Sequence, residues 1–231
     1  MGLTNAQIIN QACLVAKCPG YQQLAGQIYN AVLTQLAQTQ DFDVMKVNDF
    51  SITANSTENF GAGPYELPDN YLRHAFREVN FQVSGVPYIL NEIPIAQWRG
   101  QYLATASQSL PTNFATVFSP SKQAYLWPPP NSAYVITWCY YKSHTDIANP
   151  ETSDAEPWMQ DTLWMIKKIA YELMMITDDT RAEAFGRDCA DVLRKYIEMK
   201  EDKEGFPFTV ALGNSFQGNW GATPITKNVG W

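Results

Sequence analysis

Two hydrophobic periods divide this chain of 231 residues, and the change between them constrains its fold more than any single motif. Apolar side chains recur every three or four residues near both ends, whereas they alternate with polar side chains through the middle. The first period predicts amphipathic helices and the second predicts strands. We therefore expect an α+β fold, in which N- and C-terminal hairpins form a four-helix unit around an inserted antiparallel β-rich domain and an extended C-terminal arm follows.

The charged residues change at the same boundaries. The first 40 residues and the last 27 carry one charged side chain each, whereas the middle of the chain and the second helical part are strongly charged. We divide the chain accordingly into an N-terminal helical hairpin (1–40), a β-rich insertion (41–150), a C-terminal helical hairpin that packs on the first (151–204) and a docking arm (205–231).

The N-terminal hairpin has recognisable ends. Thr4 with Gln7 three residues later fits a capping box, and Pro19-Gly20 separates the first helix from a second that runs from about Tyr21 to Thr39. Its exposed positions hold Gln and Asn instead of Lys and Glu. Such a face can pack against a neighbour without desolvating charge, or it is simply a solvated polar face; the sequence leaves both readings open.

The middle of the chain predicts strands separated by turns, with one short helix at Ile95–Tyr102. The predicted strands are Asp49–Phe60, Leu72–Val83, Phe114–Phe118, Ala124–Trp127 and Tyr134–Tyr141. Both faces of the last strand carry large apolar or aromatic side chains. We expect it to be the central strand, covered on both sides.

The C-terminal hairpin is predicted as a helix from about Trp158 to Ile176 and a second helix that starts after a capping box at Thr180 and ends near Lys203. The second helix carries apolar residues at steps of four and three, a narrow stripe that we call the seam and expect to pack against another helix. The seam consists of Phe185, Cys189, Val192, Tyr196 and Met199.

The last segment is rich in glycine, yet it carries five aromatic side chains that would be unfavourable in water. These residues are Phe206, Phe208, Phe216, Trp220 and Trp231. Spaced aromatic residues on a pliable backbone are typical of a peptide that docks in an extended form on a partner. The alternative is that the arm folds back on its own domain.

The sequence contains no pattern that calls for catalysis, a cofactor or a metal. The two histidines, His74 and His144, lack the context of a catalytic triad, and there is no phosphate-binding loop and no Cys/His cluster with zinc spacing. We expect no enzyme. The net charge of −7 disfavours a protein that grips nucleic acid, and no apolar run is long enough to span a membrane. The four cysteines are expected to be free thiols.

Several short motifs, in one order, resemble the head-to-tail connector (adaptor) proteins of tailed bacteriophages. Tyr65–Arg73 is similar to that family's Leu-Pro-Asp-aromatic-Leu-Arg stretch, and Gly85–Tyr88 follows. Leu126–Pro130 resembles the family's proline turn, and Tyr134–Lys142 its Tyr-rich strand. The likeness covers residues 4–231 in layout.

The resemblance implies a structural virion protein, made in the host cytoplasm and placed at the head-tail interface. It implies a ring of twelve copies, the portal protein above and a tail nozzle or tube protein below. Whether tail fibres attach to the β-rich insertion is left open by the sequence. Genome DNA would pass the channel without sequence-specific binding, and the family has no catalytic residues. In such a ring, the neutral hairpin and the seam are expected to supply the lateral contacts, and the aromatic arm to dock on the portal.

Two alternatives remain at this stage. One is a carbohydrate-binding or hydrolytic accessory domain that uses Trp127, Trp138 and nearby acids. The other is a different tail-completion ring protein, such as a stopper, because the adaptor role is defined by neighbours.

Overall fold

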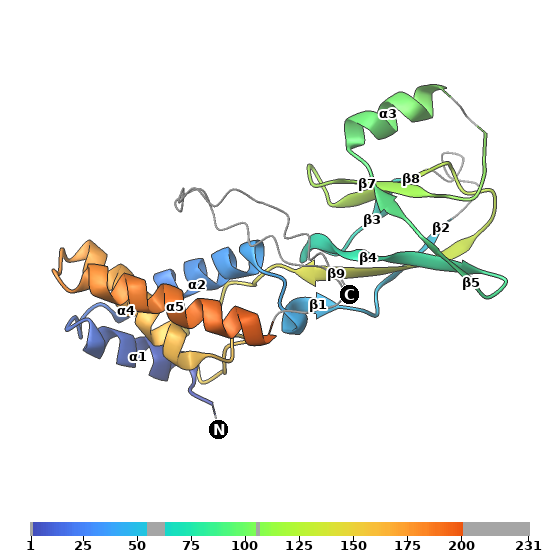
Figure 1. Cartoon of the computed structure of the whole chain (residues 1–231). Coiled ribbons are helices and arrows are strands. Elements are labelled where there is room, and N and C mark those ends of the chain that lie inside the picture. The colour runs from blue at the N-terminus through green and yellow to red at the C-terminus, as the bar shows by residue number, and fades with distance from the viewer. Residues whose placement is uncertain (1, 55–62, 105–106, 201–231) are drawn as a thin grey trace, which may run out of the picture.

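The helices near both ends of the chain gather at one end of the molecule, and the strands with one further helix lie at the other, in a computed structural model that describes residues 2–54, 63–104 and 107–200 (Figure 1). The α+β class expected from the two hydrophobic periods is therefore confirmed. The predicted arm at 205–231 lies outside the described residues.

Four helices from the two ends of the chain form the helical part. They are α1 (Asn5–Val15), α2 (Gln22–Thr39), α4 (Thr162–Ile176) and α5 (Ala182–Lys200). Helix α1 packs on α2 and α4, α2 also contacts α4, and α5 packs on α4. The capping box is present at the start of α1, where Gln7 N donates to Thr4 Oγ1 (3.3 Å) and Thr4 N donates to Gln7 Oε1 (3.0 Å).

The C-terminal helices begin later than the sequence predicts. Helix α4 starts at Thr162 because the carboxylate of Asp161 accepts a hydrogen bond from Trp164 N at 2.9 Å, and a short turn, η3 (Pro150–Thr152), precedes it. Helix α5 starts at Ala182, after Asp179 accepts from Arg181 N at 2.9 Å. Acidic side chains lie at both starts, and for α5 this differs from the expected capping box at Thr180.

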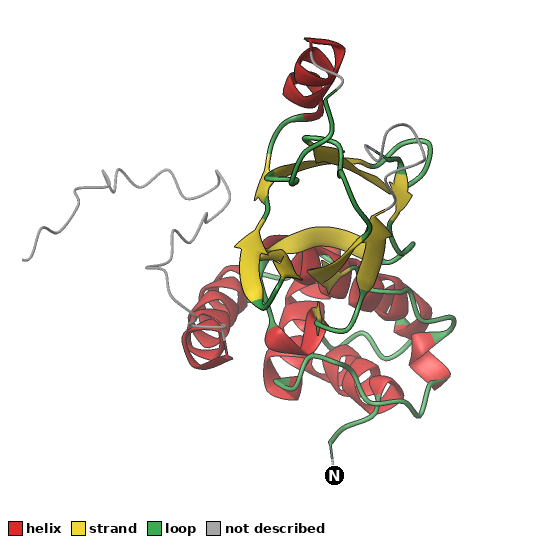
Figure 2. Cartoon of the chain, turned by 90° about the vertical axis from the view of Figure 1, so that its right-hand side faces the viewer, coloured by secondary structure: helices red, strands yellow, loops and turns green. Residues whose placement is uncertain are grey.

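The strands form two sheets, which lie as separate layers next to the helices (Figure 2). The first sheet has the order β1-β9-β4-β5, with β2 also paired to β9, and consists of β1 (Lys46–Val47), β2 (Ser51–Ala54), β4 (Tyr71–Val83), β5 (Val86–Ile89) and β9 (Tyr134–Lys142). The second sheet has the order β3-β8-β7-β6 and consists of β3 (Tyr65–Glu66), β6 (Asn91–Glu92), β7 (Asn113–Val117) and β8 (Gln123–Trp127).

One pair of strands departs from the expected antiparallel arrangement. Strands β6 and β7 are parallel, and the chain between them contains α3 (Ile95–Ala104), because a crossover is needed to join parallel neighbours. The predicted short helix at 95–102 is confirmed, and its Trp98 Nε1 donates to the Leu126 carbonyl at 2.9 Å. The prediction of a wholly antiparallel insertion is wrong at this pair.

Strand β9 belongs to two hydrophobic cores at once. Ile136, Trp138 and Tyr140 point into an aromatic core formed by the two sheets. Cys139 and Tyr141, on the opposite face, belong to the core of the helices. The expected central strand, covered on both sides, is therefore confirmed, and it joins the two halves of the fold.

Candidate interaction surfaces

The predicted seam lies inside the molecule. Cys189 and Tyr196 are buried, while Phe185 and Val192 are partly buried and pack against the core of the helices. Met199 belongs to α5, but its side chain lies outside the described part. Because α5 already packs on α4 of the same chain, the seam is not available as the lateral contact that we expected it to supply.

The aromatic residues of the arm lie outside the described residues, so their docking role stays a prediction. These residues are Phe206, Phe208, Phe216, Trp220 and Trp231.

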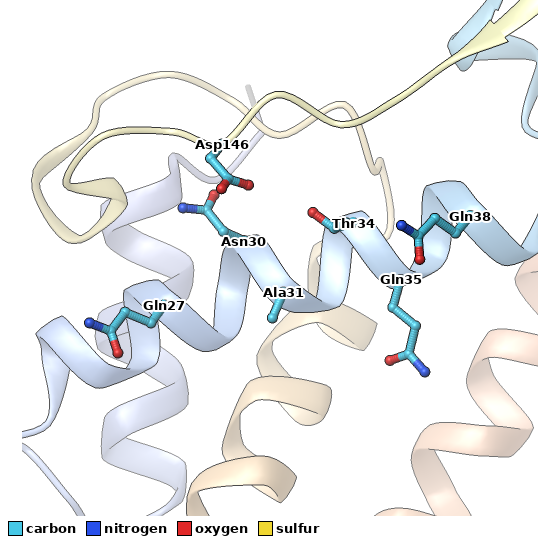
Figure 3. Close-up of a pocket in the computed structure, with 7 residues that line it drawn as sticks. All are labelled: Gln27, Asn30, Ala31, Thr34, Gln35, Gln38 and Asp146. Atoms are coloured by element: carbon cyan, nitrogen blue, oxygen red, sulfur yellow. The ribbon is translucent and has the colours of Figure 1, made fainter. Parts of the chain in front are cut away.

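An open groove of about 460 Å³ runs along the outer face of α2 (Figure 3). Polar, uncharged side chains supply most of its lining, and a loop that follows β9 supplies the single charge. The lining residues are Gln27, Asn30, Ala31, Thr34, Gln35, Gln38 and Asp146. Neither α1 nor α2 contains a charged residue. The groove can therefore receive a polar surface through amide hydrogen bonds, with little charge to desolvate.

The loop that carries Asp146 is fixed to α2 by one amide side chain. Asn30 Nδ2 donates to the Ile147 carbonyl at 3.0 Å, and Ile147 N donates to Asn30 Oδ1 at 3.1 Å. This reciprocal pair imitates backbone pairing and holds the loop over the helix. One edge of the groove is therefore built before any partner arrives.

His144 completes the same connection and is not arranged as a catalytic base. Trp158 Nε1 donates to His144 Nδ1 at 3.3 Å, so the ring proton sits on Nε2, which lies 3.4 Å from Asn30 Oδ1. Burial lowers the pKa of His144, although Asp146 opposes that shift. The neutral imidazole thus bridges α2 and the segment before α4, with both ring nitrogens engaged.

Arg73 caps the C-terminal end of α2, a role that its sequence context did not indicate. Arg73, from β4, donates through Nη1 to the carbonyls of Ala37 and Gln38, both at 3.1 Å, and through Nη2 to that of Gln40 at 2.7 Å. Its Nε donates to Asp41 at 2.7 Å. The last turn of α2 has no basic residue of its own, which is the sequence signal that its carbonyls need a donor from elsewhere.

The turn before Arg73 is held in a similar way. Lys122 Nζ donates to the carbonyls of Asp69 and Tyr71, the latter at 2.8 Å, and Leu67 N donates to the Lys122 carbonyl at 2.9 Å. The Tyr65–Arg73 stretch, which carries part of the resemblance, therefore serves to fix the second sheet and α2 to the first sheet.

The tryptophans proposed for sugar binding do not form a platform. Trp138 is fully buried, with the Phe114 ring 4.7 Å away between centroids, and cannot stack on a ligand. Trp127 is half-buried and packs on a small cluster that contains Trp98. The other histidine, His74, is half-buried as well, and its Nδ1 lies 3.7 Å from Glu92 Oε2.

The four cysteines are free thiols, as expected. Within the described ranges, no group of three or more His, Cys, Asp or Glu residues is placed to hold a metal ion. Each helix in that part of the chain is too short or too polar to cross a bilayer. Comparison with protein-family models and with curated proteins found no match to the chain.

Proposed function

We propose that this chain is a structural virion protein, a head-to-tail adaptor that forms a ring between the portal and the tail and lines the DNA channel. The observation that carries the proposal is the charge-free face of α2 on an otherwise acidic chain. Identical subunits with a charge of −7 repel one another, so contact between copies is favoured where charge is absent. The order of motifs that resembles the connector family supports the same function.

In this proposal the α2 groove meets a different surface of the next copy. Such a heterologous contact closes into a ring when the rotation between copies permits it. The resemblance suggests twelve copies, with the portal protein above and a tail nozzle or tube protein below. The acidic chain would let genome DNA pass through the lumen without holding it, because like charges repel.

The proposal is tested by quantitative mass spectrometry of purified particles of the source virus, with the copies of this chain counted against the portal protein. We expect about one copy per portal subunit, as a ring matched to the portal requires. Absence of the chain from particles would contradict a structural role. A copy number far below that of the portal would contradict a matched ring.

A further inference from the structure

Strand β2 is the least protected sheet edge in the described part of the chain. Proteins protect edge strands with proline, with charge or by keeping them short, because unpaired N–H and C=O groups invite another strand. Strand β5 carries Pro87, and the two-residue strands β1, β3 and β6 contain Lys46, Glu66 and Glu92. Strand β2 (Ser51–Ala54) has four residues, none charged and none proline.

The outward backbone groups of β2 can be identified from the pairing. Trp138 N donates to the Phe50 carbonyl at 2.9 Å, which turns Phe50 toward β9. Because bonding alternates along an antiparallel strand, Ile52 also faces β9, whereas Ser51 and Thr53 direct their N–H and C=O groups away from it. No strand of the described ranges pairs with that side. Two donors and two acceptors are therefore placed to receive a strand.

The described chain ends near the strand that precedes β2. Helix α5 ends at Lys200, and in its last turns Tyr196 contacts Phe42, with ring centroids 5.8 Å apart. Phe42 lies four residues before β1, which continues into β2, and Figure 1 shows the end of α5 beside β1. The described chain therefore ends beside β1, which lies on the same side of β9 as β2.

The sequence that follows contains a strand pattern. Residues 208–212 read Phe-Thr-Val-Ala-Leu, in which Phe208, Val210 and Leu212 share one side of an extended chain. The segment has no charge, and Pro207 stands just before it, where a proline is tolerated. Phe208 comes eight residues after Lys200, so the connection can span up to roughly 27 Å.

We propose that residues 208–212 pair with β2 of their own chain as a further strand of the first sheet. The added strand would satisfy the backbone groups of Ser51 and Thr53, and its apolar side would extend the aromatic core beyond Ile52. Attachment in the same chain is favoured because the short connection gives a high effective concentration. This inference does not depend on the proposed function, and it leaves Phe216, Trp220 and Trp231 for a partner.

Amide hydrogen exchange on the full chain, resolved by NMR, tests the proposal. We expect the amides of Ser51 and Thr53 to exchange on the order of 100-fold more slowly than in an unstructured chain, as paired amides do. Thr209→Pro combined with Val210→Pro should abolish that protection, because one of the two prolines falls on a ladder donor whichever side faces β2.

The matched control is Asn214→Pro combined with Ser215→Pro, which places the same two prolines outside the segment and should leave the protection unchanged. The Ile52 amide, which faces β9, should remain slow in all variants and reports that the sheet is folded. Unprotected Ser51 and Thr53 in the full chain would overturn the proposal. Protection that survives the 209/210 variant, or that disappears on dilution and so comes from a second copy, would also overturn it.

Discussion

At the scale of single residues, one guanidinium connects a helix to a sheet. Arg73 donates four hydrogen bonds around the end of α2 and lies over the Tyr141 ring, 5.3 Å from its centroid. The C-terminal end of a helix leaves several carbonyls without partners. A planar guanidinium has five N–H donors in a fixed arrangement and can bond to more of these carbonyls than an ammonium can. Arg73 therefore closes α2 and also fixes the position of α2 against β4 and β9.

We predict that Arg73→Ala lowers the free energy of unfolding by about 2–3 kcal/mol, because several charge-assisted hydrogen bonds are lost together. Arg73→Lys should recover only part of the loss, since an ammonium cannot reproduce the fork. Urea unfolding measures the change in the free energy of unfolding for both variants. The control is Arg187→Ala, whose side chain is 79% exposed and should change stability by about 0.5 kcal/mol or less. Equal effects of the two alanine variants would contradict the role of Arg73.

His144 makes stability depend on pH. Burial keeps its pKa below the ordinary value of 6.5, so the unfolded chain binds the proton more readily than the folded chain. The resulting stabilisation is complete above pH 6.5 and is lost as the pH falls toward the lowered pKa. Protonation at Nδ1 also places a donor against Trp158 Nε1–H, which removes their hydrogen bond.

We therefore predict that the free energy of unfolding falls as the pH drops below about 6.5, and that His144→Gln makes this fall shallower. His74, whose pKa is also lowered by burial, contributes in the same direction, so His74→Gln should remove a separate share of the slope. Unfolding at a series of pH values measures each share. An unchanged slope in His144→Gln would refute the contribution of His144.

At the scale of elements, the position of α5 depends on its apolar seam. Phe185 is partly buried against the apolar core of the helices, so Phe185→Asp would place a charge in an apolar environment and should lower the free energy of unfolding by about 3 kcal/mol or more. Ala184→Asp, at the exposed neighbouring position, introduces the same charge and should have little effect. Thermal unfolding compares the two variants. Wild-type melting and assembly of Phe185→Asp would contradict this account.

Elements whose pattern is local could be predicted from the sequence, whereas those set by distant partners could not. The capping box at Thr4 and the doubly apolar β9 are local signals, and the structure confirms both. The parallel pairing of β6 with β7 depends on where a crossover places two short strands. The seam could be found by its spacing, but spacing does not reveal that α4 of the same chain covers it. The Arg73 clamp requires knowledge of which strand lies beside the end of α2.

At the scale of the whole molecule, charge and aromatic content divide the chain into parts of different composition. The helices of the first 40 residues are neutral, and the last segment combines aromatic residues with almost no charge. The middle and second helical parts carry all 23 acidic residues. This distribution agrees with a subunit that meets copies of itself through one face and a partner through its C-terminal end.

We predict that deletion of residues 206–231 leaves a folded protein that no longer binds the portal protein, because the aromatic anchors are removed while both cores remain. Circular dichroism and sedimentation would establish the fold, and titration against purified portal would measure binding. The full chain is the control. Unchanged affinity of the truncated protein for the portal would contradict a docking role for the arm.

The sharing of β9 between two cores also protects the chain against mispairing. A slip of one residue along β4 would turn Trp138 toward the helices and Cys139 toward the sheets. The helical core would then have to accept an indole in a space shaped for a thiol, while the aromatic core would be left with a void. Both cores would therefore disfavour the shifted register. The free-energy difference between correct and shifted pairing is thus larger than either core would give alone.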